Sequence, residues 1–450
     1  MYGSQLIEKI EAQACRIGII GLGNEGLLLA LLFAQAKFKV GAYDERQTLI
    51  DDLRGGVSPI AGLPSAHLVK LLSAGMLQPT AQFEALCDAD AYIICLPAPS
   101  KKGRTFDLSY IEQTVEALLD IWKPGKLAII ESIAYPGSTN ELFLQPFLRR
   151  GLLPDRDFFM ALSPERSEAV EKNYGLSQIP KLLSGITPRS ETAATALYNM
   201  VFDQIIPVSS VRVAELTKLL ENSFRSVNTA LINEFDEVCQ QLGVNTSEVI
   251  AAAKTKPFGF MAFSPGGTVE SNIAAEFQCA NKEQRLVALA HEINQERPRQ
   301  LVYRIMEKLS WLGKPLLWAN ILVLGVANQP IMSEAADSPT VALIEQLMLR
   351  GALVTYSDPA IRQITLQDER VLQHNPLSKL LLSEADLVVI AAPNVTCNAT
   401  LLAEFEDKIL DVNGSYEALP EVIKLHKREN ESTLKYQPTN PVGSKKRNVS

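Results

Sequence analysis

The chain is poor in the features that mark several classes of protein. Its six cysteines are scattered through 450 residues, with no CxxC pair to hold a metal and no spacing that suggests a disulfide framework. No apolar run is long enough to cross a bilayer, and no basic-then-apolar leader opens the chain. The net charge of −8 leaves no basic field to attract nucleic acid. We therefore expect a protein of the reducing cytoplasm with no metal, membrane or nucleic-acid partner.

The chain does contain the pattern of a large globular protein with more than one core. A length of 450 residues and an apolar content of 47% suit two or three domains. Near the N-terminus, apolar runs alternate with helical segments, which predicts βαβ units and a buried parallel sheet. These runs are 16–22, 39–44, 91–97 and 127–132, and 160–207 continues in the same style.

A different pattern follows in the middle of the chain. Large apolar side chains recur at helical spacing from about 211 to 243 and predict one long helix, namely Leu216, Leu220, Phe224, Val227, Leu231, Phe235 and Val238. A second α/β block begins at 318. The fold class we predict is α/β, with two Rossmann-like doubly wound parallel-sheet domains joined by a long central helix. Its expected parts are an N-terminal domain (1–207), a central helical region (208–312), a C-terminal domain (313–426) and a disordered polar tail (427–450).

A glycine-rich loop joins the first expected strand to the helix after it. Gly21, Gly23 and Gly26 in "GLGNEG" stand in GxGxxG register. Glycines at these places permit a tight turn, close approach of backbone N–H groups to a diphosphate, and close helix–strand packing. The loop follows a strand and opens a helix, which is the context that dinucleotide binding requires. A glycine-rich turn without a ligand is the alternative.

Charged residues near this loop refine the prediction. Asp44 ends the next strand, where its carboxylate can accept a hydrogen bond from a ribose hydroxyl. Asp44 and Glu45 would repel a 2′-phosphate, so NAD is favoured over NADP, although Arg46 tempers this preference. Glu25 lies inside the phosphate loop and lowers affinity for an anion unless its side chain points away. We therefore expect NAD to bind, with weakened affinity.

A second group of polar residues comes from the long helix and a strand end. Lys218 and Asn222 are four residues apart and share a helix face opposite the apolar stripe. Periodicity favours a solvated face, whereas the functional alternative is a pair of donors that hold an oxyanion in an interdomain cleft. Glu165 in "LSPER" is either a strand-end carboxylate at the same cleft or a surface partner of Arg166. The residues alone leave these alternatives open.

Together these stretches resemble the UDP-glucose/GDP-mannose dehydrogenase family, and most of all its bacterial branch that oxidises UDP-N-acetylhexosamines for surface polysaccharides. The segments "GLGNEGLLLA", "ICLPAP", "ESIAYPGST", "SPER", "KNYGL", "VAELTKLLENSFRSVN" and "KPFGFM" stand in the family's order. The resemblance covers nearly the whole chain except the tail. It implies oxidation of a sugar C6 alcohol to a carboxylate with two NAD per turnover, and dimerisation through the long helix.

The resemblance also implies roles for single residues. Glu165, Lys218 and Asn222 match catalytic positions of the family. Pro97 of "ICLPAP" and Glu131 of "ESIAYPGST" match its cofactor side. Phe258, Gly259 and Phe260 of "KPFGFM" match its grip on the sugar nucleotide.

Other family positions are not retained. After "KPFGFM" the chain reads "AFSPGGTVESNIAAEF", without the family's catalytic cysteine thiolate or its water-handling aspartate. Cys279 is the nearest thiol, and it lies well past the loop. Further departures from the family's residues are Ile133 and Ala98 beside the cofactor, and Val170 and Glu171 near the substrate. The places where the family's basic groups would meet the nucleotide hold Asn328, Gln329 and Ala336.

A thiolate captures the aldehyde stage of the reaction, so its loss should stop the four-electron oxidation. The sequence therefore predicts a catalytically impaired relative, acting as a homodimer or as a mixed-dimer partner of an active paralogue. One alternative is an active NAD oxidoreductase that performs a two-electron reaction on a nucleotide sugar. Another is a module that binds NAD alone.

Overall fold

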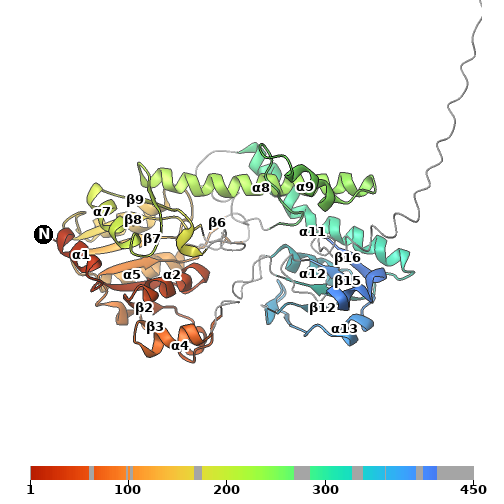
Figure 1. Ribbon diagram of the computed structural model, residues 1–450, viewed down its shortest axis with the longest axis horizontal. Helices are drawn as coiled ribbons and strands as arrows, with labels where there is room; N and C mark the ends of the chain where they lie inside the picture. The colour runs from red at the N-terminus through yellow and green to blue at the C-terminus, as the bar shows by residue number, and fades with distance from the viewer. Residues whose placement is uncertain are drawn as a thin grey trace, which may run out of the picture.

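The structure is a computed structural model that describes residues 2–59, 65–97, 100–101, 105–166, 175–267, 284–326, 338–359, 361–391 and 399–412. Two α/β bodies lie at opposite ends of the molecule, and one long helix extends from the first toward the second (Figure 1). This arrangement confirms the predicted fold class. Several sequence predictions fall outside the described residues: the loop after Gly267 with Cys279, the departures at Ala98, Val170, Glu171, Asn328, Gln329 and Ala336, and the tail from 427.

An eight-stranded sheet forms the core of the N-terminal body, in the order β10-β9-β8-β7-β4-β1-β2-β3. β1 pairs in parallel with both β2 and β4, so the strand order reverses there. β9 runs antiparallel to β8, whereas the other pairs are parallel. The strands are β1 (Arg16–Ile20), β2 (Lys39–Tyr43), β3 (Leu77–Thr80), β4 (Ala91–Ile94), β7 (Lys126–Ile130), β8 (Phe158–Leu162), β9 (Lys181–Gly185) and β10 (Ile205–Pro207).

Helices cover the sheet because its central strands are apolar on both faces. They include α2 (Asn24–Gln35), α3 (Gln47–Arg54), α4 (Ser65–Ser73), α5 (Ser109–Asp120), η2 (Thr139–Leu144), α6 (Gln145–Arg149) and α7 (Pro188–Tyr198). Shorter elements are η1 (Phe83–Leu86), η4 (Leu176–Gln178) and a ribbon of β5 (Ser100–Lys101) with β6 (Thr105–Phe106).

An N-terminal helix, α1 (Tyr2–Glu11), precedes the sheet and was not predicted from the sequence. It packs against α7 (Figure 1). Its Leu6 and Ile10 side chains are buried. Lys9 anchors it further through an ion pair with Asp90 at 2.7 Å. A ten-residue amphipathic helix is marginal alone, so tertiary packing stabilises it.

The long helix is α8 (Val211–Gln241), as the apolar spacing predicted. The Ser210 hydroxyl caps it by accepting a hydrogen bond from the Val213 N–H at 3.3 Å. Its 31 residues span about 46 Å, and in Figure 1 it runs along the top of the molecule. The central region also contains α9 (Thr246–Lys254) and α11 (Arg285–Trp311).

The packing of α8 reverses the usual amphipathic arrangement. Leu219 and Ile232 are buried, but six of its large apolar side chains are exposed, namely Leu216, Leu220, Phe224, Leu231, Phe235 and Val238. Its buried face is largely polar and includes Asn222, Ser226, Thr229, Asn233 and Asp236. This polar face is paired with groups of α9, α11 and the loop that follows α9.

The contact between α8 and α11 is built from buried hydrogen bonds and ion pairs. The Asn233 amide donates to Asn294 Oδ1 at 2.9 Å. The Asp236 carboxylate pairs with Arg297 at 2.5 Å and with Arg304 at 2.9 Å, and it accepts a hydrogen bond from the Thr246 hydroxyl at 2.7 Å. These bonds satisfy polar groups that would be costly to bury unpaired.

The C-terminal body holds a four-stranded parallel sheet in the order β12-β11-β15-β16. Its elements are β11 (Asn320–Leu324), α12 (Pro339–Leu349), β12 (Leu353–Ser357), the hairpin β13 (Gln363–Thr365) with β14 (Val371–Gln373), α13 (Lys379–Glu384), β15 (Leu387–Ile390), α14 (Ala399–Ala403), η6 (Glu406–Lys408) and β16 (Ile409–Asp411).

One corner of the first sheet recurs in the second. After β1, the Leu22 N–H donates to Asp44 Oδ2, at the end of β2, at 2.9 Å. After β11, the Val326 N–H donates to Asp358 Oδ2, at the end of β12, at 2.7 Å. The two bodies therefore share the strand–turn geometry typical of nucleotide-binding α/β domains.

Candidate functional site

The phosphate loop has the geometry that its three glycines predict. Gly21 has a φ of +90°, and a Cβ there would lie 2.3 Å from the Cys95 carbonyl oxygen. A Cβ on Gly26 would lie 1.8 Å from the Gly21 carbonyl oxygen. A Cβ on Gly23 would meet nothing within 4 Å. Gly21 and Gly26 are thus required for packing, whereas Gly23 leaves open space where a diphosphate could approach the N-terminus of α2.

Asp44 lies where a ribose-binding carboxylate is expected. It is buried at the end of β2, and one of its oxygens accepts the Leu22 N–H. The Arg46 guanidinium donates to both oxygens, at 2.8 and 3.0 Å. Burial would raise the pKa of the Asp44 carboxyl, but the hydrogen bonds from Arg46 and Leu22 more than offset burial and lower it. The carboxylate is therefore ionised at neutral pH, as a hydrogen-bond acceptor for ribose must be.

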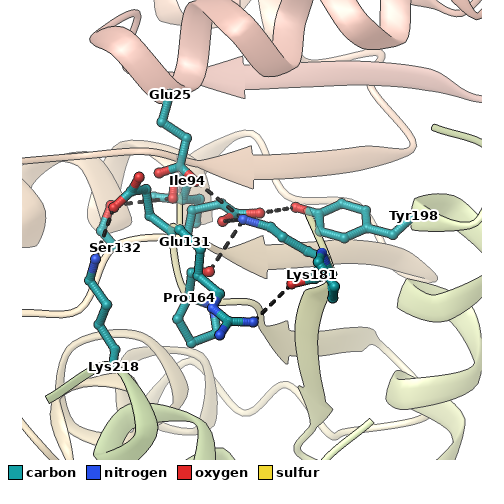
Figure 2. Close-up of polar contacts among 11 residues, drawn as sticks. Glu25, Ile94, Glu131, Ser132, Pro164, Lys181, Tyr198 and Lys218 are labelled. Carbon is teal, nitrogen blue, oxygen red and sulfur yellow. Dashed lines mark hydrogen bonds and ion pairs between the residues drawn. The ribbon is translucent and has the colours of Figure 1, made fainter. Parts of the chain in front are cut away.

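Glu25 points into the protein interior. Its carboxylate lies 3.2 Å from Lys181 Nζ, and Figure 2 shows it reaching down from the phosphate loop toward that lysine. The Lys181 ammonium also pairs with Glu131 and donates to the Pro164 carbonyl oxygen at 3.3 Å. The Tyr198 hydroxyl donates to the other oxygen of Glu131. We call Glu25, Glu131, Lys181 and Tyr198 the buried charge cluster.

The cofactor-side residues implied by the resemblance stand at the same edge of the sheet. Pro97 is exposed just beyond β4, and Glu131 directly follows β7. Glu131 is fully buried, and both of its carboxylate oxygens are held within the cluster. A direct contact of either residue with NAD stays a prediction.

Glu165, Lys218 and Asn222 are brought together by β8 and α8. Lys218 Nζ lies 3.1 Å from Glu165 Oε2. Asn222 is buried one turn farther along α8, so the interpretation of this helix face as solvated is wrong. Glu165 is not the partner of Arg166, because Arg166 pairs with Glu221 instead. The arrangement places an ammonium and an amide on one buried face, which suits stabilisation of an oxyanion.

Glu215 ties this part of α8 to the turn in "ESIAYPGST". Its buried carboxylate accepts the N–H groups of Gly137 at 2.7 Å and Thr139 at 3.0 Å. An acidic group is favourable there because it satisfies free donors at the start of η2. The cofactor-side turn and the helix that carries Lys218 are thereby held together.

The loop that begins with "KPFGFM" lies along α8. Phe258 is 72% exposed, Phe260 is partly exposed, and Gly259 has a φ of +73°. Phe263 contacts Phe224 edge-on, with ring centroids 5.9 Å apart. Farther on, the Gly266 N–H donates to the Asn233 side chain at 2.8 Å. The predicted substrate-binding residues Phe258, Gly259 and Phe260 therefore project from a loop that is anchored to α8 at its far end.

Sequence reasoning missed Lys181, Tyr198, Glu215 and Glu221. One signal pointed to the first of them, because a carboxylate inside a phosphate loop requires a nearby cation. Lys181 opens the apolar run "KLLSG", where a charged residue among buried neighbours is unusual.

Two kinds of feature are absent from the described ranges. No group of three or more His, Cys, Asp or Glu side chains there is arranged to hold a metal ion. None of the helices described has both the length and the apolar character that a membrane span needs.

A glycine-rich phosphate loop at the strand reversal of a doubly wound sheet, with a buried carboxylate at the end of the next strand, defines a dinucleotide-binding protein. Comparison with known proteins agrees: residues 15–202 match the NAD binding domain of the UDP-glucose/GDP-mannose dehydrogenase family, and residues 212–296 match its central domain. The chain belongs to this family, as the resemblance predicted.

Its relatives include nucleotide-sugar dehydrogenases. The chain is 30% identical over 382 residues to UDP-N-acetyl-D-mannosamine dehydrogenase of Pyrococcus horikoshii, covering 84% of this chain and 88% of the relative. It is 30% identical over 393 residues to the enzyme of the same name from Campylobacter jejuni, covering 83% and 94%. The solved structure of the Pyrococcus horikoshii UDP-D-ManNAc dehydrogenase superposes with a TM-score of 0.75 at 27% identity, covering 90% and 97%.

Proposed function

We propose that this chain binds NAD and a nucleotide sugar at the junction of the N-terminal sheet and α8, and that it does not complete the oxidation of a sugar alcohol to an acid. The observation that carries the proposal is a contrast. The Glu165–Lys218 pair stands at 3.1 Å beside the buried Asn222, yet no cysteine occurs between Cys239 and Cys279. The chain keeps Lys218 and Asn222, which can hold the sugar oxygen. It lacks a cysteine directly after "KPFGFM".

The chemistry explains why this loss matters. NAD, when bound, supplies the hydride acceptor. Lys218 and Asn222 can hold the sugar oxygen while the alcohol carbon gives up a hydride and the hydroxyl gives up a proton, which leaves an aldehyde. An aldehyde carbon has no second hydride to give until a nucleophile adds to it. Without the thiolate, the reaction stops at two electrons or does not begin.

The names of the relatives indicate the class of ligand. Two proteins named UDP-N-acetyl-D-mannosamine dehydrogenase are 30% identical to this chain, over 382 and 393 aligned residues. We therefore propose a UDP-N-acetylhexosamine as the sugar nucleotide, in a cytoplasmic pathway that makes surface polysaccharide. The nucleotide-type corner at Val326 and Asp358 supports a second nucleotide-binding domain.

The exposed face of α8 supports a role in an assembly. Six exposed large apolar side chains lie on one helix face, and contiguous apolar patches often mark protein–protein interaction sites. We propose that this face pairs with the same face of a second copy, or with that of an active paralogue whose activity the chain supports.

The decisive experiment counts NADH. Purified protein is incubated with NAD and a panel of UDP-N-acetylhexosamines, and NAD binding is measured separately by calorimetry. NAD binding without NADH formation supports an impaired relative or a module that binds NAD alone. One NADH per sugar favours the second candidate, a two-electron oxidoreductase, which the intact Glu165–Lys218 pair makes chemically reasonable. Two NADH per sugar would contradict the proposal.

A pair of variants tests whether any NADH formation depends on Lys218. Lys218→Met removes the ammonium at the site and should abolish NADH formation. Arg212→Met, on an exposed position of the same helix, should leave it unchanged. NADH formation that survives Lys218→Met would remove this lysine from the proposed chemistry.

A further inference from the structure

The buried charge cluster accommodates the acidic residue of the phosphate loop. Glu25 lies in the first turn of α2, where helix-end N–H groups should face the diphosphate of NAD. A free carboxylate there would repel the ligand. Instead its side chain is largely buried and lies 3.2 Å from Lys181 Nζ, on a strand that begins 156 residues later.

The charges of the cluster do not sum to zero if Glu25, Glu131 and Lys181 are all ionised. Glu25 and Glu131 contribute two carboxylates, whereas Lys181 contributes one ammonium, so one negative charge is in excess. Their side chains are 13%, 0% and 5% exposed, respectively. Tyr198 donates its hydroxyl hydrogen to Glu131 and adds no positive charge. An excess charge in so dry a place is costly, and binding a proton removes it.

The groups around Glu25 identify which carboxyl takes the proton. Glu131 follows β7, Lys181 opens β9, Glu165 follows β8 and Cys95 follows β4. Burial raises the pKa of Glu25 well above its ordinary value, the negative charge of Glu131 raises it further, and Glu165 adds to this effect, while Lys181 opposes it. These effects favour Glu25 as the carboxyl group that holds the proton.

We propose that Lys181 is a positioning residue that, with one proton held on Glu25, keeps the "GLGNEG" loop electrically neutral, so that NAD binding by this chain depends on that proton. Lys181 also donates to the Pro164 carbonyl oxygen, and the next residue is Glu165, the partner of Lys218. The same lysine thus links the phosphate loop to the oxyanion side of the site.

The direction of the pH effect follows from the charge count. At low pH, Glu25 is neutral and Lys181 balances Glu131. As pH rises through the folded pKa of Glu25, a negative charge develops beneath the loop and NAD affinity falls. The folded pKa of Glu25 lies above its unfolded value of about 4.5, so its stabilising contribution is complete below that pH and is lost as pH rises through the folded pKa.

The experiment is a pH series of NAD calorimetry on the full chain. For the wild type, we expect the dissociation constant to rise at least tenfold between pH 6 and pH 9. Above the folded pKa of Glu25, binding should take up a proton, as shown by heats measured in buffers of different ionisation enthalpy. Glu25→Gln keeps the shape but cannot ionise, so its affinity should stay flat over that range and its proton uptake should vanish.

A double-variant cycle tests Lys181. Lys181→Met leaves two carboxyl groups without a cation and should weaken NAD binding at least tenfold at pH 7. Adding Glu25→Gln to Lys181→Met should recover most of that loss. Lys123→Met, which breaks an exposed pair with Asp88 in the same domain, should have no effect.

Thermal unfolding without NAD is measured for every variant. If Lys181→Met does not fold, the comparison of Glu25→Gln with the wild type across the pH series decides alone. Equal pH dependence in these two proteins would overturn the proposal. So would a wild type that binds no NAD at any pH, or a folded Lys181→Met protein with wild-type affinity.

Discussion

Glu25 and Lys181 are 156 residues apart in the sequence and 3.2 Å apart in the structure. Their contact turns an acid that should disfavour an anionic cofactor into part of a buried pair beneath the loop. It also places α2, β7 and β9 around one ammonium group. The cofactor loop of this family member is therefore supported by charge pairing as well as by glycine geometry.

The glycines of the loop should separate stability from binding. Gly26→Ala places a methyl group 1.8 Å from the Gly21 carbonyl oxygen, so we expect it to lower the free energy of unfolding by about 3 kcal/mol. Gly23→Ala meets nothing within 4 Å, so it should change stability by less than about 1 kcal/mol. It should nevertheless weaken NAD binding about tenfold or more, because the methyl group occupies space that the diphosphate needs.

Urea unfolding and NAD calorimetry on the two glycine variants provide the measurement. The prediction fails if Gly23→Ala binds NAD as tightly as the wild type. It also fails if Gly26→Ala unfolds at the same urea concentration as the wild type.

The buried pair between α8 and α11 should be important for folding. Asp236→Asn leaves Arg297 buried without its counter-charge, so we expect a loss of about 3–5 kcal/mol in the free energy of unfolding. Glu296→Gln breaks an exposed pair with Arg299 on α11 and should cost less than about 0.5 kcal/mol. Chemical unfolding at pH 7 measures both changes, and similar costs for the two variants would refute the prediction.

The same carboxylate predicts a pH effect. Burial alone would raise the pKa of Asp236, but the charges of Arg297 and Arg304 and the hydrogen bond from Thr246 lower it below its ordinary 3.8. Its stabilising contribution is therefore complete above the unfolded pKa and is lost as pH falls through the folded value. The difference in unfolding midpoint between wild type and Asp236→Asn should be constant from pH 6 to 8 and shrink below about pH 4.

Glu215 should hold the cofactor-side turn against α8. In Glu215→Gln, the new amide N–H₂ faces a backbone donor, Gly137 or Thr139, so a loss of about 1–3 kcal/mol in stability is expected. Glu141→Gln changes an exposed acceptor of the Tyr135 hydroxyl nearby and serves as the control. Differential scanning fluorimetry should show a clear drop in melting temperature for the first variant only.

The apolar stripe of α8 should control assembly. Leu220→Glu combined with Phe224→Glu places two charges on the exposed face, so the double variant should sediment as a monomer at concentrations where the proposed homodimer of the wild type forms. Leu349→Glu, an equally exposed leucine on α12, should leave the dimer intact. A monomeric wild type at micromolar concentrations would contradict the proposed homodimer, and mixing with an active paralogue would then test the mixed dimer.

Much of the fold could be read from local patterns. The strands β1, β2 and β4 lie within predicted apolar runs, β7 overlaps one from its second residue, and α8 lies within the predicted long helix. The helix α1 was not predicted, because its stability comes from packing on α7 rather than from a strong sequence pattern of its own. The glycine register located the phosphate loop, because backbone geometry there depends on residue type at fixed spacing.

The pairing of charged groups could not be read in this way. The neighbours Glu165 and Arg166 suggested a local ion pair, yet each is matched to a different residue of α8. Periodicity predicted the apolar stripe of α8, but the structure exposes that stripe and buries the polar face. The helix packs this way because α11 and the loop after α9 offer hydrogen-bonding partners to the polar face.

The sequence by itself determined the central strands, the long helix, the dinucleotide loop and the absence of a thiol between "KPFGFM" and Cys279, because each depends on residue types at short spacing. Only the tertiary structure decided which carboxylate meets which cation and which face of α8 is left open. Those outcomes depend on distances between residues far apart in the chain, and such distances exist only once the sheet and helices have packed. For that reason the sequence did not reveal the role of Lys181, which lies at the start of β9 and pairs with both Glu25 and Glu131.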